Sequence, residues 1–152
     1  MKFHINPSEG VNDIKFGMTS GEVRDRISGN FEVIKRGLVV KEFSDHFPID
    51  YYRLEGILCI YDEEGRLEGM QFYEPSRPTL GIADLLSLSI AQAASLLRQS
   101  DPELEFHLSD GFVSRRLNMS IFSPDMNENG QALVGNVFVA RTGYFDYLDT
   151  PP

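Results

Sequence analysis

The chain between Tyr52 and Tyr73 reads YRLEGILCIYDEEGRLEGMQFY, which predicts a strand, a tight polar turn and a second strand. Successive side chains of a strand point to opposite faces, so the run from Leu54 to Tyr61 is largely apolar on both. A strand with two apolar faces suits the middle of a sheet, where both faces are covered. The prediction places Leu54, Leu58 and Ile60 on one face and Ile57, Cys59 and Tyr61 on the other.

A polar turn separates the two predicted strands. Residues 62–65 read DEEG, and Gly65 can adopt the positive φ that a bulged hairpin loop requires. The return strand, residues 66–73, divides its apolar side chains between the faces, with Met70 and Phe72 on one and Leu67 and Tyr73 on the other. We therefore expect this hairpin to form the middle of an antiparallel sheet.

Helix and strand signals recur on both sides of the hairpin. Thr19 and Glu22 have the spacing of a capping box, which predicts a helix that continues through Val23 and Ile27. Residues 84–99 predict a second, longer helix, within which Ser89 resembles Thr19 as a helix start. The predicted strands are residues 31–36, 38–43, 54–61, 66–73, 104–108, 111–117, 119–123 and 132–142.

Each half of the chain therefore predicts one helix followed by three or four strands. The halves are residues 10–76 and 80–146, on either side of a break marked by prolines at 75 and 78. A length of 152 residues is typical of one domain with a sizeable core. We predict a single α+β domain over residues 1–152, an antiparallel sheet with two helices, and the recurrence points to a duplicated αββββ unit.

Composition limits the classes of function. The 14 Lys and Arg against 23 Asp and Glu give a net charge of −9. Such a charge disfavours nucleic acid and anionic membranes as partners and favours basic proteins, although acidity can also serve only to keep a small domain in solution. No apolar run reaches the roughly 18 residues of a membrane span, and polar residues interrupt the N-terminal stretch where a signal peptide would lie. We expect a cytoplasmic protein.

The residues that usually carry catalysis or bind metal form no recognisable pattern in the sequence. His4, His46 and His107 lack ligand spacing, no serine lies in a nucleophile elbow, and no glycine-rich phosphate loop occurs. Residues 125–130 match the opening of a calcium loop, but Asn136 stands where its bidentate Glu is required. We therefore predict no enzyme activity, no metal and no cofactor.

The single cysteine, Cys59, lies inside the apolar strand of the hairpin. It has no partner for an internal disulfide, and its apolar neighbours predict a small buried side chain rather than a nucleophile.

Acidic residues are concentrated around the central hairpin. Residues 42–74 contain nine Asp and Glu against two Arg. Such a stretch is usually a solvated face, but carboxylates also suit docking to a basic protein surface. Charge and loop position select five candidate partner-binding residues: Asp45, Asp50, Asp62, Glu63 and Glu64.

Four segments carry a family resemblance: IKFGMT at 14–19 followed by EVR at 22–24, DHF at 45–47 ahead of the hairpin at Tyr61 and Asp62, GMQF at 69–72, and GYFD at 143–146. In this order, over residues 10–146, they resemble a family of small bacterial immunity proteins of contact-dependent growth inhibition and related polymorphic toxin systems. The resemblance implies a protein without catalytic activity that binds and blocks a cognate toxin domain. It assigns no binding residue.

We expect the toxin to be a nuclease, because a basic cleft that binds nucleic acid attracts an acidic inhibitor. Two alternatives stay open from the residues alone. One is a small-ligand-binding or assembly module without catalytic activity, and the other is an enzyme that uses a pair of acids in a cleft. A toxin gene directly upstream would favour immunity, whereas a metabolic operon would favour the alternatives.

Overall fold

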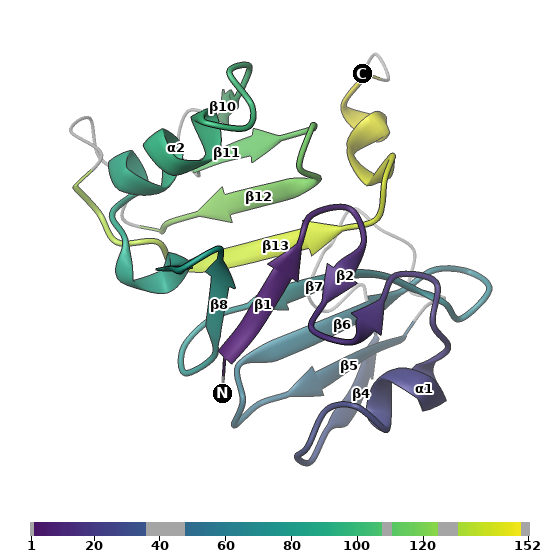
Figure 1. Cartoon of the computed structure of the whole chain (residues 1–152). Coiled ribbons are helices and arrows are strands. Elements are labelled where there is room, and N and C mark those ends of the chain that lie inside the picture. The colour runs from purple at the N-terminus through teal and green to yellow at the C-terminus, as the bar shows by residue number, and fades with distance from the viewer. Residues whose placement is uncertain (1, 36–47, 108–110, 125–130, 150–152) are drawn as a thin grey trace.

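Eight antiparallel strands form the main sheet of the protein (Figure 1). The computed structural model describes residues 2–35, 48–107, 111–124 and 131–149. The strands of the main sheet lie in the spatial order β10 (Glu105–His107), β11 (Gly111–Ser114), β12 (Met119–Phe122), β13 (Asn136–Ala140), β7 (Leu67–Phe72), β6 (Ile57–Tyr61), β5 (Pro48–Tyr52) and β4 (Glu32–Lys35). The α+β fold class is as predicted, and the hairpin of β6 and β7 lies in the interior of the sheet.

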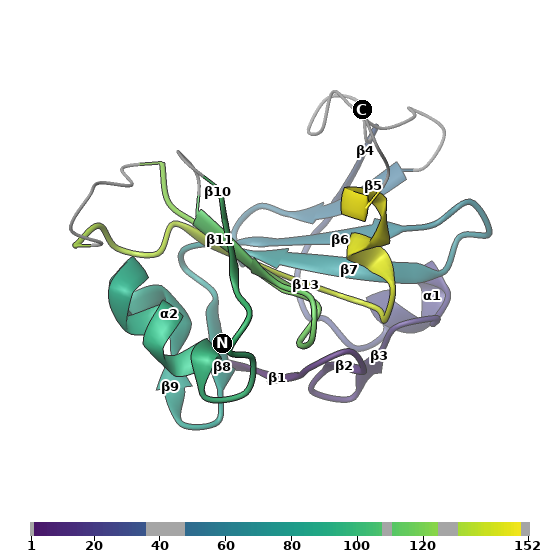
Figure 2. The ribbon, with the colours of Figure 1, turned by 90° about the horizontal axis from the view of Figure 1, so that it is seen from above.

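A smaller sheet and two α-helices lie on one face of the main sheet, and the 3₁₀ helix η3 lies on the other (Figure 2). The smaller sheet has the order β3 (Ile14–Lys15), β2 (Gly10–Val11), β1 (Lys2–Asn6), β8 (Arg77–Leu80) and β9 (Ala83–Asp84). The helices are α1 (Ser20–Arg24), η2 (Leu85–Ser87), α2 (Ile90–Arg98) and η3 (Tyr144–Asp149). The parallel pairing of β1 with β8 joins the start of the chain to the connector between its halves.

The order of elements recurs along the chain. α1 is followed by β4 to β7, and α2 by β10 to β13. The last strands of the two runs, β7 and β13, pair at the centre, so the strand order reads the same outward from this pair in both directions. Both helices begin with a capping box, at Thr19 and at Ser89. Each cap residue also forms an isolated bridge to the chain ahead of the last strand, Thr19 to Arg66 and Ser89 to Leu133.

The first strand of the central hairpin is buried on both faces, as predicted. All five residues of β6 are buried. Leu58 and Ile60 lie in one apolar core, and Ile57, Cys59 and Tyr61 lie in the other.

Two side chains of the hairpin lie elsewhere than predicted. Leu54 falls in the turn before β6 and is 75% exposed. Leu67 shares the core of Met70 instead of facing the opposite side. The pairing of β6 with β7 shifts register between Ile60 and Tyr61, and such a bulge reverses the alternation of side chains beyond it.

Both helices are shorter than predicted. α1 ends at Arg24, and Ile27 follows it in an irregular segment that still buries its side chain. α2 begins only at Ile90, because the Ser89 hydroxyl accepts a hydrogen bond from the backbone N–H of Gln92 and caps the helix there.

The last strand is also shorter than its sequence pattern. The prediction covers residues 132–142, but β13 begins at Asn136. The backbone N–H of Val134 donates to the carbonyl of Leu88, 3.0 Å away, so this part of the chain pairs with the start of α2 instead of extending the ladder. The predicted strand over residues 38–43 lies outside the described residues.

Two apolar cores follow from this layering. The larger core lies between the main sheet and the elements that cover it, and it includes Phe3, Val23, Phe72, Leu97 and Phe112. The smaller core lies on the opposite face, where sheet residues such as Ile49, Ile60 and Phe138 pack with Phe145 of η3.

Candidate functional site

Asp50 lies in the interior and not at the surface where the sequence analysis placed it. Its side chain is 1% exposed, with Oδ1 2.6 Å from Nη2 of Arg24 and Oδ2 2.8 Å from Nε of Arg24. The hydroxyl of Tyr61 donates to Oδ2 at 2.9 Å. The prediction of Asp50 as a partner-binding residue is therefore wrong, because its carboxylate already binds a cation from α1 inside the fold.

The residues around Asp50 form a buried polar cluster that joins α1 to the sheet. The hydrogen bond from Arg24 to Asp50 raises the pKa of the guanidinium, which stays charged. Burial raises the pKa of the Tyr61 hydroxyl and of the Cys59 thiol, so both stay protonated. A buried protonated thiol is a poor nucleophile, which agrees with the prediction for Cys59.

The acids at the tip of the central hairpin have two different roles. Asp62 is half-buried and shapes the turn, since its Oδ1 accepts from the backbone N–H groups of Glu64 at 2.9 Å and Arg66 at 3.0 Å. Glu63 and Glu64 are exposed. Asp45, the remaining candidate, lies outside the described residues. The structure thus leaves the carboxylates of Glu63 and Glu64 at the surface, as the sequence predicted.

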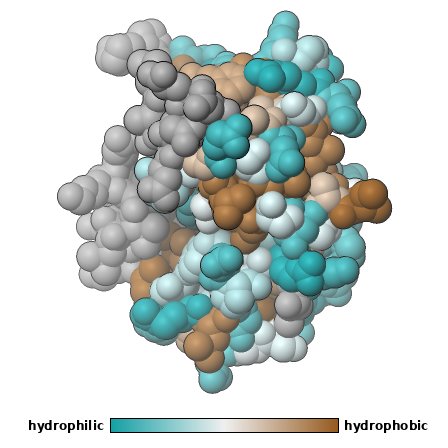
Figure 3. All heavy atoms as spheres, turned by 90° about the vertical axis from the view of Figure 1, so that its left-hand side faces the viewer, coloured by the Kyte–Doolittle hydropathy of each residue, from teal (hydrophilic) through white to brown (hydrophobic). Residues whose placement is uncertain are grey.

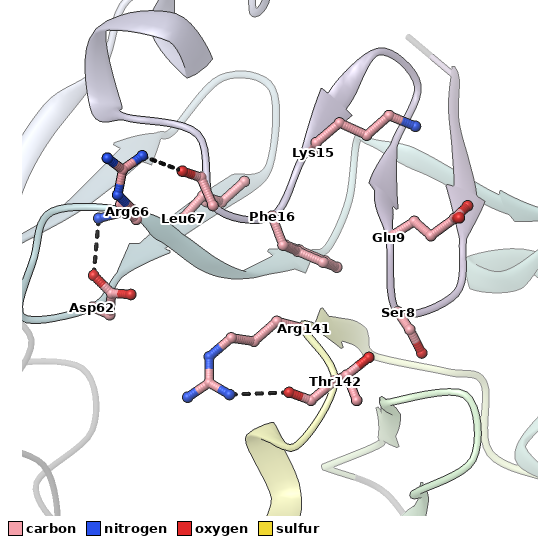
Figure 4. A pocket seen from close by; sticks show the side chains of 10 residues that line it. Ser8, Glu9, Lys15, Phe16, Asp62, Arg66, Leu67, Arg141 and Thr142 are labelled. Atoms are coloured by element: carbon pink, nitrogen blue, oxygen red, sulfur yellow. Dashed lines mark hydrogen bonds between the residues drawn. The ribbon is translucent and has the colours of Figure 1, made fainter.

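Beside this hairpin tip lies a cavity of about 460 Å³ (Figure 4). Three cationic side chains line it from separate segments: Lys15, Arg66 and Arg141. Nη1 of Arg66 donates to the carbonyl of Gly17 at 2.9 Å, and Nη1 of Arg141 donates to the carbonyl of Thr142 at 3.1 Å. Nη2 of Arg141 also lies 3.8 Å from Oε2 of Glu68, and the acids Glu9 and Asp62 line the cavity too, so only part of this cationic lining could bind an anionic group. Sequence reasoning missed this cavity because strand pairing alone brings these distant segments together.

The face of the main sheet that carries η3 presents mainly uncharged and aromatic side chains, with Glu32 of β4 next to Tyr51 at one end and Glu105 of β10 next to Val113 at the other. A row of cross-strand neighbours crosses six strands through Tyr51, Leu58, Gln71, Phe138, Ser120 and Val113. Leu58, Phe138 and Val113 are buried, whereas the other members of the row are half-buried. We use the name aromatic face for six of the half-buried residues on this side: Tyr51, Gln71, Tyr73, Ser120, Phe122 and Asn136. Among the described elements, only η3 packs on this side.

Tyr51 and Tyr73 are the best-defined contact on the aromatic face. Their ring centroids lie 6.2 Å apart, and burial together with a hydrogen bond to Tyr51 raises the pKa of the Tyr73 hydroxyl. The guanidinium of Arg53 lies 5.0 Å from the centroid of the Tyr51 ring and forms an exposed ion pair with Glu32. Rigid, half-exposed tyrosines beside an arginine are typical of protein-binding surfaces.

A groove runs between η3 and the sheet. Its volume is about 380 Å³, and its walls include Val113, Ser120 and Phe122 from the sheet and Phe145, Tyr147 and Leu148 from η3. We call it the η3 groove. It joins the aromatic face at Ser120 and Phe122, which belong to both.

Exposed apolar side chains also occur away from the aromatic face. Figure 3 shows one side of the molecule, where apolar residues reach the surface in groups with polar residues between them. Ile82 and Leu133 are 105% and 64% exposed. Scattered exposure of this kind is usual for folded proteins and indicates no site by itself.

In the four described ranges, no group of three His, Cys, Asp or Glu side chains is placed to hold a metal ion. The calcium-like loop at residues 125–130 lies outside those ranges, as does His46. The helices of the described ranges are all too short or too polar to cross a membrane.

The chain was also compared with known proteins. No family model, no curated protein and no solved structure matches it.

Proposed function

We propose that this chain is an immunity protein that binds a cognate toxin domain by direct contact and blocks it. The observation that carries the proposal is the aromatic face, a broad sheet surface with half-buried tyrosine and phenylalanine side chains, where the charged residues lie at the two ends: Glu32 and Arg53 beside Tyr51, and Glu105 beside Val113. Tyr and Phe supply large contact area at a small cost in side-chain entropy, and charged residues are depleted from the centre of protein interfaces. The family resemblance of the sequence supports the same function.

The charge of the protein favours a basic toxin, and we propose a nuclease acting in the cytoplasm. The net charge is −9, and Glu63 and Glu64 are exposed at the hairpin tip. A basic cleft that binds a phosphate backbone attracts such a surface, which accelerates association. Inhibition then requires no chemical step by this chain, since covering the cleft excludes the substrate.

The test is coexpression with the product of the gene directly upstream of this one, which the proposal expects to encode a toxin domain. Cells that carry the toxin alone should stop growing, and coexpression of this chain should restore growth with the two proteins eluting as one complex in size-exclusion chromatography. A folded chain that neither protects nor binds this toxin would contradict the proposal. So would a metabolic operon with no toxin gene beside this one.

The cavity beside the hairpin tip favours one alternative, a small-ligand-binding module. Its volume of about 460 Å³ falls within the roughly 300–1,000 Å³ typical of ligand sites. Arg66 and Arg141 would bind a carboxylate or a phosphate. Calorimetric titration with citrate and with inorganic phosphate separates the functions: saturable submillimolar binding that Arg141→Met abolishes would favour the alternative.

A further inference from the structure

We propose that the η3 groove is the anchor pocket of the toxin-binding surface, and that it receives one aromatic or branched aliphatic side chain flanked by Lys or Arg on the toxin. This inference rests on the proposed function and names the chemistry of the partner. A few anchors in well-packed pockets carry most of the binding energy of a protein interface.

Two small residues of the sheet, Ser120 and Gly111, line the groove. In the row across the sheet, Ser120 pairs with Val113 on one side and with Phe138 on the other. Val113 is large, whereas Gly111, which pairs with Phe122, has no side chain, so a hollow remains over Ser120 and Gly111. Phe145 and Leu148 of η3 stand over this hollow as its wall.

The wall of the groove is held in place. Arg115 forms an ion pair with Asp149 of η3 and another with Glu105 of β10, where Nε lies 2.8 Å from Oε1. On the inner side, the ring of Phe145 packs edge-on against Phe138 with centroids 6.1 Å apart. A preformed pocket needs little ordering on binding, so more of the contact energy appears as affinity.

The charges around the groove select basic neighbours for the anchor. η3 reads YFDYLD, with Asp146 and Asp149 exposed and no basic residue. Glu105 adds a third carboxylate and Arg115 the one cation of the ion-paired cluster, so these four residues carry a net charge of −2. The lining is apolar apart from Ser120 and His107, which disfavours a charged anchor itself, because burying an unpaired charge is costly. The pattern that fits is therefore an apolar residue between cations.

Three short peptides test this pattern without the toxin: acetyl-Lys-Phe-Arg-amide, acetyl-Lys-Ala-Arg-amide and acetyl-Glu-Phe-Glu-amide. Titration followed by NMR should shift the backbone amide signals of Ser120, Phe122 and Leu148 with the first peptide. The alanine peptide should bind roughly tenfold more weakly, because a buried Phe side chain is missing. The acidic peptide should bind severalfold more weakly at low salt, and this difference should shrink at about 1 M salt.

Two variants test whether the peptide binds in the η3 groove. Ser120→Trp fills the hollow and should abolish the shifts, with Ser120→Leu as the milder filling if the first variant does not fold. Ser95→Trp adds the same ring on the exposed side of α2 and should bind like the parent. Equal binding of the phenylalanine and alanine peptides, or normal binding by a folded Ser120→Trp protein, would overturn the proposal.

The remaining outcomes identify other occupants. Light scattering that gives twice 17.2 kDa for the parent and the single mass for Ser120→Trp would show that a second copy fills the groove, which contradicts the proposal. Tighter binding of indole than of the basic peptide would also contradict the proposal, because it would indicate an uncharged small ligand in the groove.

The toxin itself separates the anchor from the proposed function. If the parent and Ser95→Trp protect cells but Ser120→Trp does not, the anchor is supported. Full protection by that variant refutes the anchor while the proposed function stands, and no protection by the parent refutes the function.

Discussion

The carboxylate of Asp50 lies 2.6 Å from the guanidinium of Arg24, which makes this ion pair a direct link between α1 and strand β5. Asp50 is 1% exposed and Arg24 32%. Removal of the cation alone leaves a buried carboxylate without its charged partner, which is far more costly than the loss of an exposed pair.

Arg24→Met should lower the free energy of unfolding by about 3 kcal/mol, as measured by urea denaturation. Arg53→Met is the matched control, because the pair of Arg53 with Glu32 is 64% and 54% exposed. That control should lose less than about 1 kcal/mol. Equal losses in the two variants would mean that the Asp50 pair contributes no more than a surface contact.

Ile60→Asp should destabilise the fold by several kcal/mol, since Ile60 is 3% exposed in the smaller core and the new carboxylate would be buried without a cation. Leu54→Asp makes the same change in the preceding turn, at a side chain that is 75% exposed. It should change the free energy of unfolding by less than about 0.5 kcal/mol. The melting temperatures of both variants, compared with that of the parent, test this prediction. An Ile60→Asp protein that melts at the same temperature as the parent would contradict the burial of β6.

The stability of the second half should depend on pH through Asp101. Burial opposes ionisation of this carboxyl, but hydrogen bonds from the Ser114 hydroxyl at 2.7 Å and the Glu103 backbone N–H at 2.9 Å outweigh burial, and its pKa lies below the ordinary value of 3.8. A carboxyl with a lowered folded pKa stabilises the fold above its unfolded pKa and loses that contribution as pH falls through the folded pKa.

The advantage of the parent over Asp101→Asn should therefore be constant above about pH 5 and shrink below it. Urea denaturation at a series of pH values measures this difference. Ser114→Ala, which removes the only side-chain hydrogen bond among those that lower the pKa of Asp101, should reduce the pH-dependent part. A difference between parent and Asp101→Asn that grows on acidification would contradict the sign of the shift.

Tyr51→Ala should weaken binding of the toxin at least about tenfold, because it removes a large half-buried ring from the β5 end of the aromatic face. Ile82→Ala, at a fully exposed side chain in the turn between β8 and β9, is the control and should bind like the parent. Surface plasmon resonance measures the dissociation constant of the toxin for the parent and for the two variants. A folded Tyr51→Ala protein with unchanged affinity would place the interface on another surface.

Reversal of the two exposed acids, Glu63→Lys with Glu64→Lys, should slow association with the toxin while the fold stays intact. The attraction is electrostatic, so the difference from the parent should shrink when salt shortens the range of surface charges below the roughly 8 Å of physiological conditions. Stopped-flow association rates at low and high salt measure the effect. Equal rates for the parent and the reversed variant at low salt would show that the hairpin tip does not face the partner.

The two strands of the hairpin were predictable because their pattern is local. Alternation of apolar residues with period two and the DEEG turn predict β6, β7 and an interior position without knowledge of the rest of the chain. The capping boxes at Thr19 and Ser89 are local in the same sense. They mark one helix start in each half of the chain, which allowed the recurrence of a helix followed by strands to be predicted.

The candidate site was predictable only in part. Glu63 and Glu64 are exposed because a hairpin tip projects from a sheet, but nothing in the sequence near Asp50 shows that an arginine 26 residues earlier lies against it. The aromatic face and the η3 groove combine residues from β5, β7, β11, β12, β13 and η3, whose neighbours depend on strand order.

The sequence by itself determined the central hairpin, the two capped helix starts, the α+β class and the acidity, since each depends on residue type and on spacing over a few positions, whereas it did not predict the smaller sheet. Only the tertiary structure decided which charges are buried and that a bulge places Leu67 on the other face of the sheet. It also decided that α1 and α2 cover one face of the main sheet while η3 packs on the opposite face. The physical reason is that burial and pairing are properties of residues far apart in the chain, and a single bulge or strand order changes them without changing any local pattern.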